Sequence, residues 1–154
     1  MPAIHIRRAN HDDLAAVVAG NINMAQETEG LSLDPVRVSA GVGHLIEHPE
    51  LGHYWLAFCG QTFAGQCMIT TEWSDWRNQP MWWFQSVYVV PSLRRRGVFS
   101  ALYQHVATEA QTQGVRDLRL YVERQNQPAQ ATYRQLGMLH SHYDMFETVL
   151  RSED

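Results

Sequence analysis

The chain has 154 residues, of which 45% are hydrophobic and 18% charged, a composition typical of one globular domain and not of a disordered or fibrous chain. Twelve basic side chains against 16 acidic ones give a formal net charge of −4, so the chain lacks the basic surface that nucleic-acid binding needs. All twelve basic residues are arginine. The absence of lysine excludes P-loop and kinase-type phosphate binding, and Schiff-base chemistry with pyridoxal phosphate.

The two cysteines, Cys59 and Cys67, form no C-x-x-C pair and indicate a reducing compartment. A tight hairpin turn at Gly60-Gln61 would place Cys67 opposite Tyr54 and away from Cys59, so we expect no disulfide. The first residues lack the pattern of a secretory signal peptide, and no apolar stretch is long enough to span a bilayer. We therefore expect a cytoplasmic protein without a membrane partner.

The N-terminal part of the chain predicts a short strand followed by two helices. Apolar and polar side chains alternate over residues 4–7, as they do in a strand. Asn10 is a candidate N-cap for the first helix, which ends at residues 27–30. Asp34-Pro35 starts the second helix, because proline suits the first helical position, and Pro49 marks its end.

The rest of the chain predicts further strands and two more helices. One nearly continuous apolar strand is typical of the buried centre of a sheet, and a strand–helix–strand crossover follows it. The fold class is therefore a mixed α/β sheet with helices on both faces, in a single domain over residues 1–154. The strands are expected at Tyr54–Cys59, Phe63–Glu72, Phe84–Val90, Leu118–Val122 and His140–Val149, a loop at Trp73–Pro80, and the helices at Val98–Gln113 and Asn126–Leu136.

The stretch that follows the apolar strand points to an anionic ligand. Arg94, Arg95 and Arg96 lie just before and inside the first turn of the next helix. Exposed cations there oppose the helix dipole by roughly 0.3–1 kcal/mol each, whereas the free N–H groups of a helix start attract anions. Gly97 lets the backbone come close to a ligand. The stretch predicts a phosphate-bearing ligand on the amides of residues 95–100, unless the arginines form only a solvated cluster.

Two motifs make this part of the chain resemble the GCN5-related N-acetyltransferases, the GNAT superfamily. The acyl-CoA loop of that family reads Q/R-x-x-G-x-G/A after a strand ending in V-x-P, and here the matching residues are Val89-Val90-Pro91 and Arg94-x-x-Gly97-x-Phe99. The following strand and helix of the family often carry N-x-x-A-x-x-x-Y-x-x-x-G, matched here by Asn126, Ala129, Tyr133 and Gly137. The motif match extends over residues 84–138, and the likeness is only topological before that.

Two departures from the family pattern concern the loop and the C-terminal end. Phe99 stands where the family has a small residue, and its ring can turn into the core if the ligand meets only its amide. The family ends with two strands, whereas His140–Val149 offers one. The sheet is then either one strand short or covered at its edge by a partner chain, as in a homodimer.

The resemblance implies a GNAT fold and direct attack of an acceptor amine on the thioester of acetyl-CoA, a co-substrate, without a metal. A backbone N–H around residues 87–89 would stabilise the oxyanion, Tyr133 would protonate the leaving thiolate, and Asn126 would cap its helix or also contact pantetheine. The residues implied in acetyl-CoA binding are Val87, Tyr88, Val89, Arg94, Arg95, Arg96, Gly97, Val98, Phe99, Ser100, Asn126 and Tyr133.

The acceptor amine must also lose a proton, and three carboxylates are candidates for the base. Glu72 is the first choice, acting directly or through water, and Glu27 and Glu29 border the same pocket in the family; each could instead be a solvated surface carboxylate. Trp73 and Trp76 fall in the expected loop, and aromatic faces beside carboxylates hold cationic amines. The acceptor would be a small-molecule amine or a peptide amine.

Two other functions compete with this interpretation. A non-catalytic acyl-CoA-binding module would keep the loop without turnover, although the retained Tyr133 argues against it. His44, Glu47 and His48 match the H-x-x-E-H pattern of a class of zinc peptidases, but Pro49 ends that helix at once. A zinc-dependent hydrolase is therefore the weaker alternative.

Overall fold

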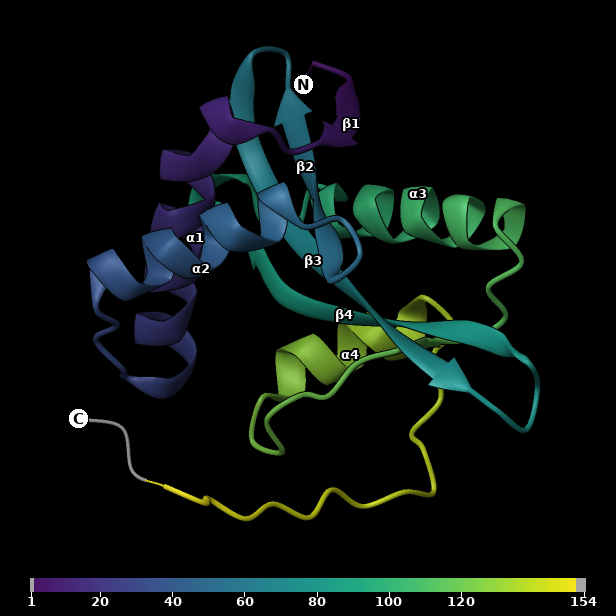
Figure 1. Ribbon diagram of the computed structural model, residues 1–154. Helices are drawn as coiled ribbons and strands as arrows, with labels where there is room; N and C mark the ends of the chain where they lie inside the picture. The colour runs from purple at the N-terminus through teal and green to yellow at the C-terminus, as the bar shows by residue number, and fades with distance from the viewer. Residues whose placement is uncertain (1, 152–154) are drawn as a thin grey trace. The chain divides into compact units, whose positions relative to one another are not determined.

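The computed structural model describes residues 2–151, and the chain divides into two compact units. The first unit reaches to Tyr121 and the second begins at Val122. The first unit is a five-stranded sheet in the order β1-β2-β3-β4-β5 (Figure 1). Its elements are β1 (Ile4–Arg8), α1 (Leu14–Glu29), α2 (Pro35–Glu47), β2 (Gly52–Cys59), β3 (Thr62–Ser74), β4 (Gln79–Val89), α3 (Val98–Thr112) and β5 (Leu118–Arg119), with short 3-10 helices at His11–Asp13 and Pro91–Leu93.

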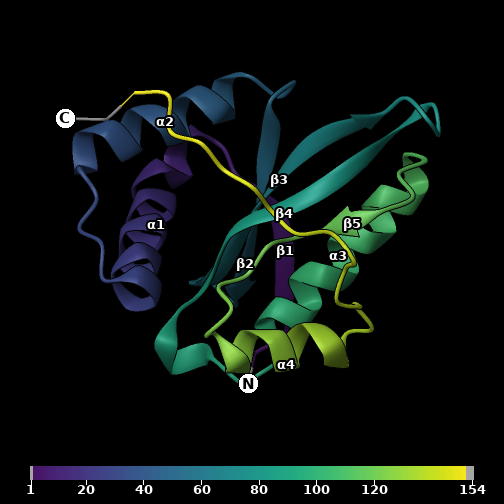
Figure 2. The same cartoon turned by 90° about the horizontal axis from the view of Figure 1, so that it is seen from below.

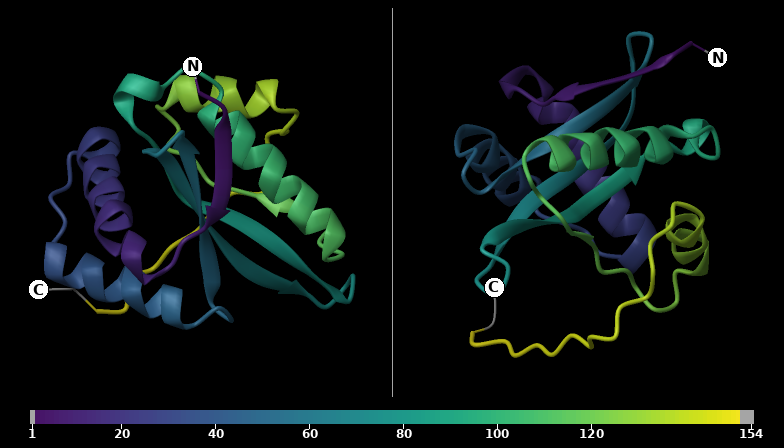
Figure 3. Two further views of the ribbon diagram at one scale, coloured as in Figure 1. Left: turned by 90° about the horizontal axis from the view of Figure 1, so that it is seen from above. Right: turned by 90° about the vertical axis from the view of Figure 1, so that its right-hand side faces the viewer.

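The sheet is mixed, because its first four strands are antiparallel and its last pair is parallel. Helix α3 makes the crossover from β4 to β5. Helices α1 and α2 lie on one face of the sheet and α3 lies on the other (Figures 2 and 3). The predicted mixed sheet with helices on both faces is therefore confirmed.

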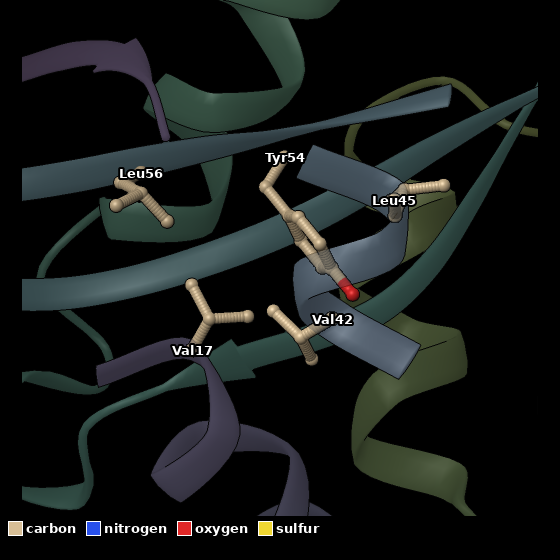
Figure 4. Packing of buried hydrophobic residues seen from close by; sticks show 5 residues of the cluster. All are labelled: Val17, Val42, Leu45, Tyr54 and Leu56. Atoms are coloured by element: carbon tan, nitrogen blue, oxygen red, sulfur yellow. The ribbon is translucent and has the colours of Figure 1, made fainter. Parts of the chain in front are cut away.

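The side chains of β2 alternate between these two faces, as expected for a strand. Tyr54 and Leu56 pack with Val17 of α1 and with Val42 and Leu45 of α2 (Figure 4). The intervening Trp55 contacts His105 of α3, with ring centroids 4.4 Å apart. Helix α3 buries Leu102, Val106 and Ala110 on one face. The sheet thus separates two apolar layers, one under each set of helices.

The helix boundaries follow the local signals of the sequence. Asn10 and Asp13 form a capping box ahead of α1, and Gly30 ends that helix in the left-handed conformation with φ of 65°. The Asp34 side chain accepts a hydrogen bond from the amide of Val36 at the start of α2. These predictions are confirmed because capping depends only on residues close in the chain.

The predicted register of the β2–β3 hairpin is wrong by one residue. Cys67 lies opposite Trp55, because β3 holds one extra residue, Ala64, between the pairs Phe58–Phe63 and Ala57–Gly65. Both cysteines are buried and free, as predicted, and burial raises the pKa of the Cys67 thiol to about 12. The bulge changes the register and leaves the disulfide prediction intact.

The predicted loop at Trp73–Pro80 is also wrong. Strand β3 continues to Ser74 and β4 starts at Gln79, so only residues 75–78 turn, and the hairpin projects beyond the other strands (Figure 1). Pro80 pairs with Trp73 within the hairpin. The amide of Trp82 points toward β5, so the nitrogen of Pro80 points the same way, beyond the end of β5. A proline there removes no ladder hydrogen bond.

The second unit contains helix α4 (Gln127–Gln135). Asn126 caps it as predicted, since its side-chain oxygen accepts a hydrogen bond from the amide of Ala129 at 3.2 Å. The predicted strand His140–Val149 does not form, and β5 is shorter than the predicted Leu118–Val122. A strand requires a ladder with a neighbour, and the described residues after 138 pair with none. The homodimer remains a prediction.

The environment of His53 in β2 predicts that the stability of the first unit depends on pH. Its ring lies 5.6 Å from Trp55 and 5.5 Å from Trp82, and its Nε2 is buried without a hydrogen-bond partner. Burial, with a smaller effect of Arg8, lowers the pKa of His53 from 6.5 to about 4. The unfolded chain therefore takes up this proton first as the pH falls.

We expect stability to decrease as the pH falls from 6.5 to 4, and this contribution to level off below that. Because the ring is partly exposed, the loss should be roughly 1–2 kcal/mol, less than the full shift implies. Urea unfolding between pH 4 and 7.5 measures it, with His53→Phe as the comparison. If the variant keeps the slope of the wild type over this window, another group is responsible.

Candidate functional site

Strand β4 carries a bulge near its C-terminal end. Gln66 of β3 pairs with Tyr88 and Met68 pairs with Gln85, so two residues of β4, Ser86 and Val87, lie opposite one residue of β3. Ser86 has a positive φ of 49°. Sequence analysis did not identify this bulge, although a pair of polar residues inside an apolar strand marks its position.

Strands β4 and β5 separate just before the bulge. They share only the pairs Trp82–Leu118 and Trp83–Arg119 (Figure 2). Among the described residues, the part of β4 from residue 84 to 89 therefore has no partner strand on the β5 side. The predicted binding segment 87–89 lies in this open stretch, where an extended ligand could pair with the backbone as an added strand.

The turn after β4 leads into α3 through an unusual backbone conformation. Arg95 and Gly97 have positive φ values of 62° and 82°, and Gly97 is the N-cap of α3 without a side-chain cap. The first amides of a helix have no intrahelical acceptor. A Cβ atom built on Gly97 meets no heavy atom within 4 Å, so the space beside these amides is open. The geometry suits an anion at the predicted place.

The three arginines of this turn do not act alike. Arg95 and Arg96 are exposed beside the start of α3. The side chain of Arg94 turns to α1 instead: its guanidinium pairs with Glu27, with 2.6 Å between Nη2 and Oε2, and its Nε donates to the carbonyl of Val89 at 2.9 Å. Arg95 and Arg96 form no ion pair with another residue of the range 2–151, so they remain for an anion at this turn.

Phe99 is accommodated by the core. Its ring is 9% exposed and lies 6.0 Å from Phe84 and 6.4 Å from Tyr103. The expectation that this ring can turn inward is confirmed.

The structure separates the predicted acceptor residues into two groups. Trp73 and Trp76, which are 59% and 89% exposed, lie at the projecting end of the β3–β4 hairpin. Glu27 and Glu29 lie in the last turn of α1, near the opposite end of β4, to which Arg94 connects Glu27. The two ends of β4 are about 30 Å apart at the usual rise per residue. These residues do not form one pocket.

Glu72 lies between these groups. Its carboxylate accepts a hydrogen bond from the indole of Trp83 at 2.9 Å and lies 3.7 Å from the guanidinium of Arg119. It pairs with Met81, so the β4 bulge is about 16 Å further along the sheet. Glu72 is therefore not adjacent to the bulge.

Two predicted site residues, Asn126 and Tyr133, belong to the second unit. Asn126 caps α4, as described above. Tyr133 lies in α4 and is half-buried, and burial raises the pKa of its phenol. The phenol is therefore protonated at neutral pH, as a proton donor must be.

The H-x-x-E-H segment does not form a zinc-site geometry. Helix α2 ends at Glu47, and the imidazole of His48 stacks on His44 with centroids 4.0 Å apart. Glu47 lies 3.5 Å from His11. Within residues 2–151, no group of three or more His, Cys, Asp or Glu side chains could hold a metal ion.

None of the helices within residues 2–151 is long and apolar enough to cross a membrane.

The chain is similar in sequence to a known protein family. Residues 19–138 match the family model described as the acetyltransferase (GNAT) family. The chain belongs to the GNAT acetyltransferases. The GNAT match includes α2, the whole β2–β4 meander, the turn before α3 and helix α4.

Solved structures of similar proteins agree with the GNAT assignment. A possible acetyltransferase from Clostridium difficile 630 is 38% identical, with a TM-score of 0.90 over 97% of this chain and 99% of that one. A predicted acetyltransferase from Clostridium acetobutylicum, solved with acetyl-CoA, has 14% identity and a TM-score of 0.77, over 96% of this chain and 97% of that one. An aminoglycoside acetyltransferase from an uncultured soil metagenomic sample, in complex with trehalose, gives the same values. No curated protein sequence matches the chain.

Proposed function

We propose that this GNAT protein transfers an acetyl group from acetyl-CoA to a primary amine. The observation that carries the proposal is the continuity between the open stretch of β4 and the uncapped start of α3. Pantetheine can pair with the first, and a diphosphate can bind the amides of the second, next to Arg95 and Arg96. The structure with acetyl-CoA among the similar folds supports this choice of donor.

The residues of this chain would divide the chemistry as follows. The amine attacks the thioester carbon, and a backbone N–H near Val87 donates to the oxyanion that develops. Tyr133 donates a proton to the thiolate as the carbon–sulfur bond breaks. A cationic amine loses one proton before it attacks and a second one as the amide forms. The second proton restores the Tyr133 phenol after this has protonated the thiolate. Since Glu72 is distant from the bulge, we propose that Glu72 receives the first proton through water and not directly.

The acceptor is proposed to be a small-molecule amine or a peptide amine. The net charge of −4 favours a cationic acceptor. Trp73 and Trp76 present two exposed aromatic rings on a projecting hairpin, which suits a peptide or protein amine better than a small molecule enclosed near the bulge. A panel that contains both kinds of amine is therefore needed.

Calorimetric titration with acetyl-CoA, with and without EDTA, tests the donor, and release of free CoA thiol with the amine panel tests the transfer. We expect micromolar binding that EDTA does not change, and thiol release that depends on an amine. Binding without thiol release for any amine would leave a non-catalytic acyl-CoA-binding module. The absence of binding would contradict the proposal itself.

A further inference from the structure

The side chain of Arg94 joins the turn before α3 to strand β4 and to helix α1. Its Nε donates to the carbonyl of Val89 at 2.9 Å, its Nη2 lies 2.6 Å from Oε2 of Glu27, and its guanidinium carbon lies 5.6 Å from the centre of the Tyr88 ring. The contact with Glu27 spans 67 positions of the sequence. This contact joins the last turn of helix α1 to the turn before α3.

The turn needs such an anchor because its backbone is unusual. Arg95 follows directly and holds the left-handed conformation, which costs a non-glycine residue roughly 1–2 kcal/mol. Strained backbone persists only where its surroundings hold it in place. Among the described residues, the amides of Arg95, Arg96 and Gly97 donate to no backbone carbonyl.

The ion pair is positioned to provide this support. The side chains of Arg94 and Glu27 are 43% and 38% exposed, so this ion pair lies at the surface. The additional hydrogen bond from Arg94 Nε to the Val89 carbonyl restricts the guanidinium more than the ion pair alone would. The pair also neutralises Arg94, so it adds no net positive charge at the anion site. The contribution of Glu27 to anion binding would therefore come from geometry and not from attraction.

We propose that Glu27 is a positioning residue for the acetyl-CoA turn: by holding Arg94, it keeps the amides of residues 95–100 in the orientation that binds the diphosphate. This inference rests on the proposed function. It gives Glu27 a role different from the acceptor contact or base predicted from the sequence. It also joins the end of α1 mechanically to the donor site.

The substitution Glu27→Gln changes CoA affinity in opposite directions, depending on whether Glu27 acts by holding Arg94 in place or by its negative charge. Removing a negative charge near an anion site should tighten CoA binding if attraction alone matters. Loss of the contact with Arg94 should instead weaken CoA binding. We expect the KM for acetyl-CoA to rise about 5-fold to 10-fold, whereas kcat at saturating acetyl-CoA and the KM of the amine stay unchanged. Glu50→Gln removes the same charge at an exposed turn and should leave all three constants as in the wild type.

A double-mutant cycle with Arg94→Gln tests whether the two residues act together. We expect Arg94→Gln to weaken binding of CoA, measured by calorimetry, and Glu27→Gln to add no further loss in that background. Additive effects, tighter CoA binding in Glu27→Gln, or a rise confined to the KM of the amine would each overturn the inference. Failure of the wild type to bind CoA would instead contradict the proposed function, so the two failures are distinguishable.

Discussion

Tyr133→Phe is expected to lower kcat about 100-fold while the Kd for acetyl-CoA changes less than about 2-fold, within the range usual for loss of a general acid. The substitution keeps the ring of this half-buried residue and removes only the hydroxyl. The thiolate then leaves without a proton donor, which affects the transition state and not the bound donor. Thiol release and calorimetry on the same preparations measure the two quantities.

The pH dependence adds a second test of the same role. Because burial raises the pKa of Tyr133 above its usual value of 10, the phenol stays protonated through the neutral and mildly alkaline range. No decrease of kcat from loss of this proton is therefore expected up to about pH 9, one unit below the usual pKa of a tyrosine. Tyr143→Phe, at an exposed tyrosine of the same unit, is the matched control and should keep the kcat of the wild type. A Tyr133→Phe enzyme with unchanged kcat would remove the general-acid assignment.

The parts of the fold that could be predicted are those that depend on neighbouring residues. The caps at Asn10, Asp34 and Asn126 each require a side chain to reach an amide two or three positions away. The glycine at position 30 ends α1 because it adopts a positive φ at little cost. Such signals are complete within one turn of chain, so the sequence alone specifies them.

The parts that could not be predicted depend on the pairing of distant segments. One extra residue at Ala64 shifts the β2–β3 register from the pair Ala57–Gly65 onward, and no residue type marks it. The segment 140–149 has enough apolar side chains for a strand, but a strand forms only where a partner is free, and this depends on the entire sheet. The same reason explains why the β3–β4 hairpin is longer than its apolar core suggests.

In the candidate site, too, the local features could be predicted, whereas those that depend on distant segments could not. The spacing around Gly97 correctly locates an uncapped helix start, because the turn is local. The direction of the Arg94 side chain is not local, since it depends on Glu27 in α1. The separation of Trp73 from Glu29 likewise follows from the length of β4, which sequence periodicity underestimated. Motifs identify the chemistry of a site, whereas its boundaries require the tertiary structure.

Gly97→Val is expected to raise the Kd for acetyl-CoA at least about 10-fold, which corresponds to about 1.4 kcal/mol of binding free energy. Two effects act at this position. The left-handed φ of 82° strains any branched side chain, and the new methyl groups would enter the open space beside the amides of the turn. Backbone strain lowers the stability of the protein. The added methyl groups should in addition hinder a ligand that approaches the backbone closely.

Gly114→Val separates these two effects. Gly114 follows the C-terminal end of α3, has a φ of 75°, and also has no heavy atom within 4 Å of an added Cβ. Both variants carry similar backbone strain, so both should lose a similar few degrees in Tm, at about 2–4 °C per kcal/mol for a chain of this size. Calorimetry with acetyl-CoA then compares them directly. An equal Kd in the two variants would place the phosphates elsewhere, since the strain is shared and only Gly97 borders the uncapped amides of α3.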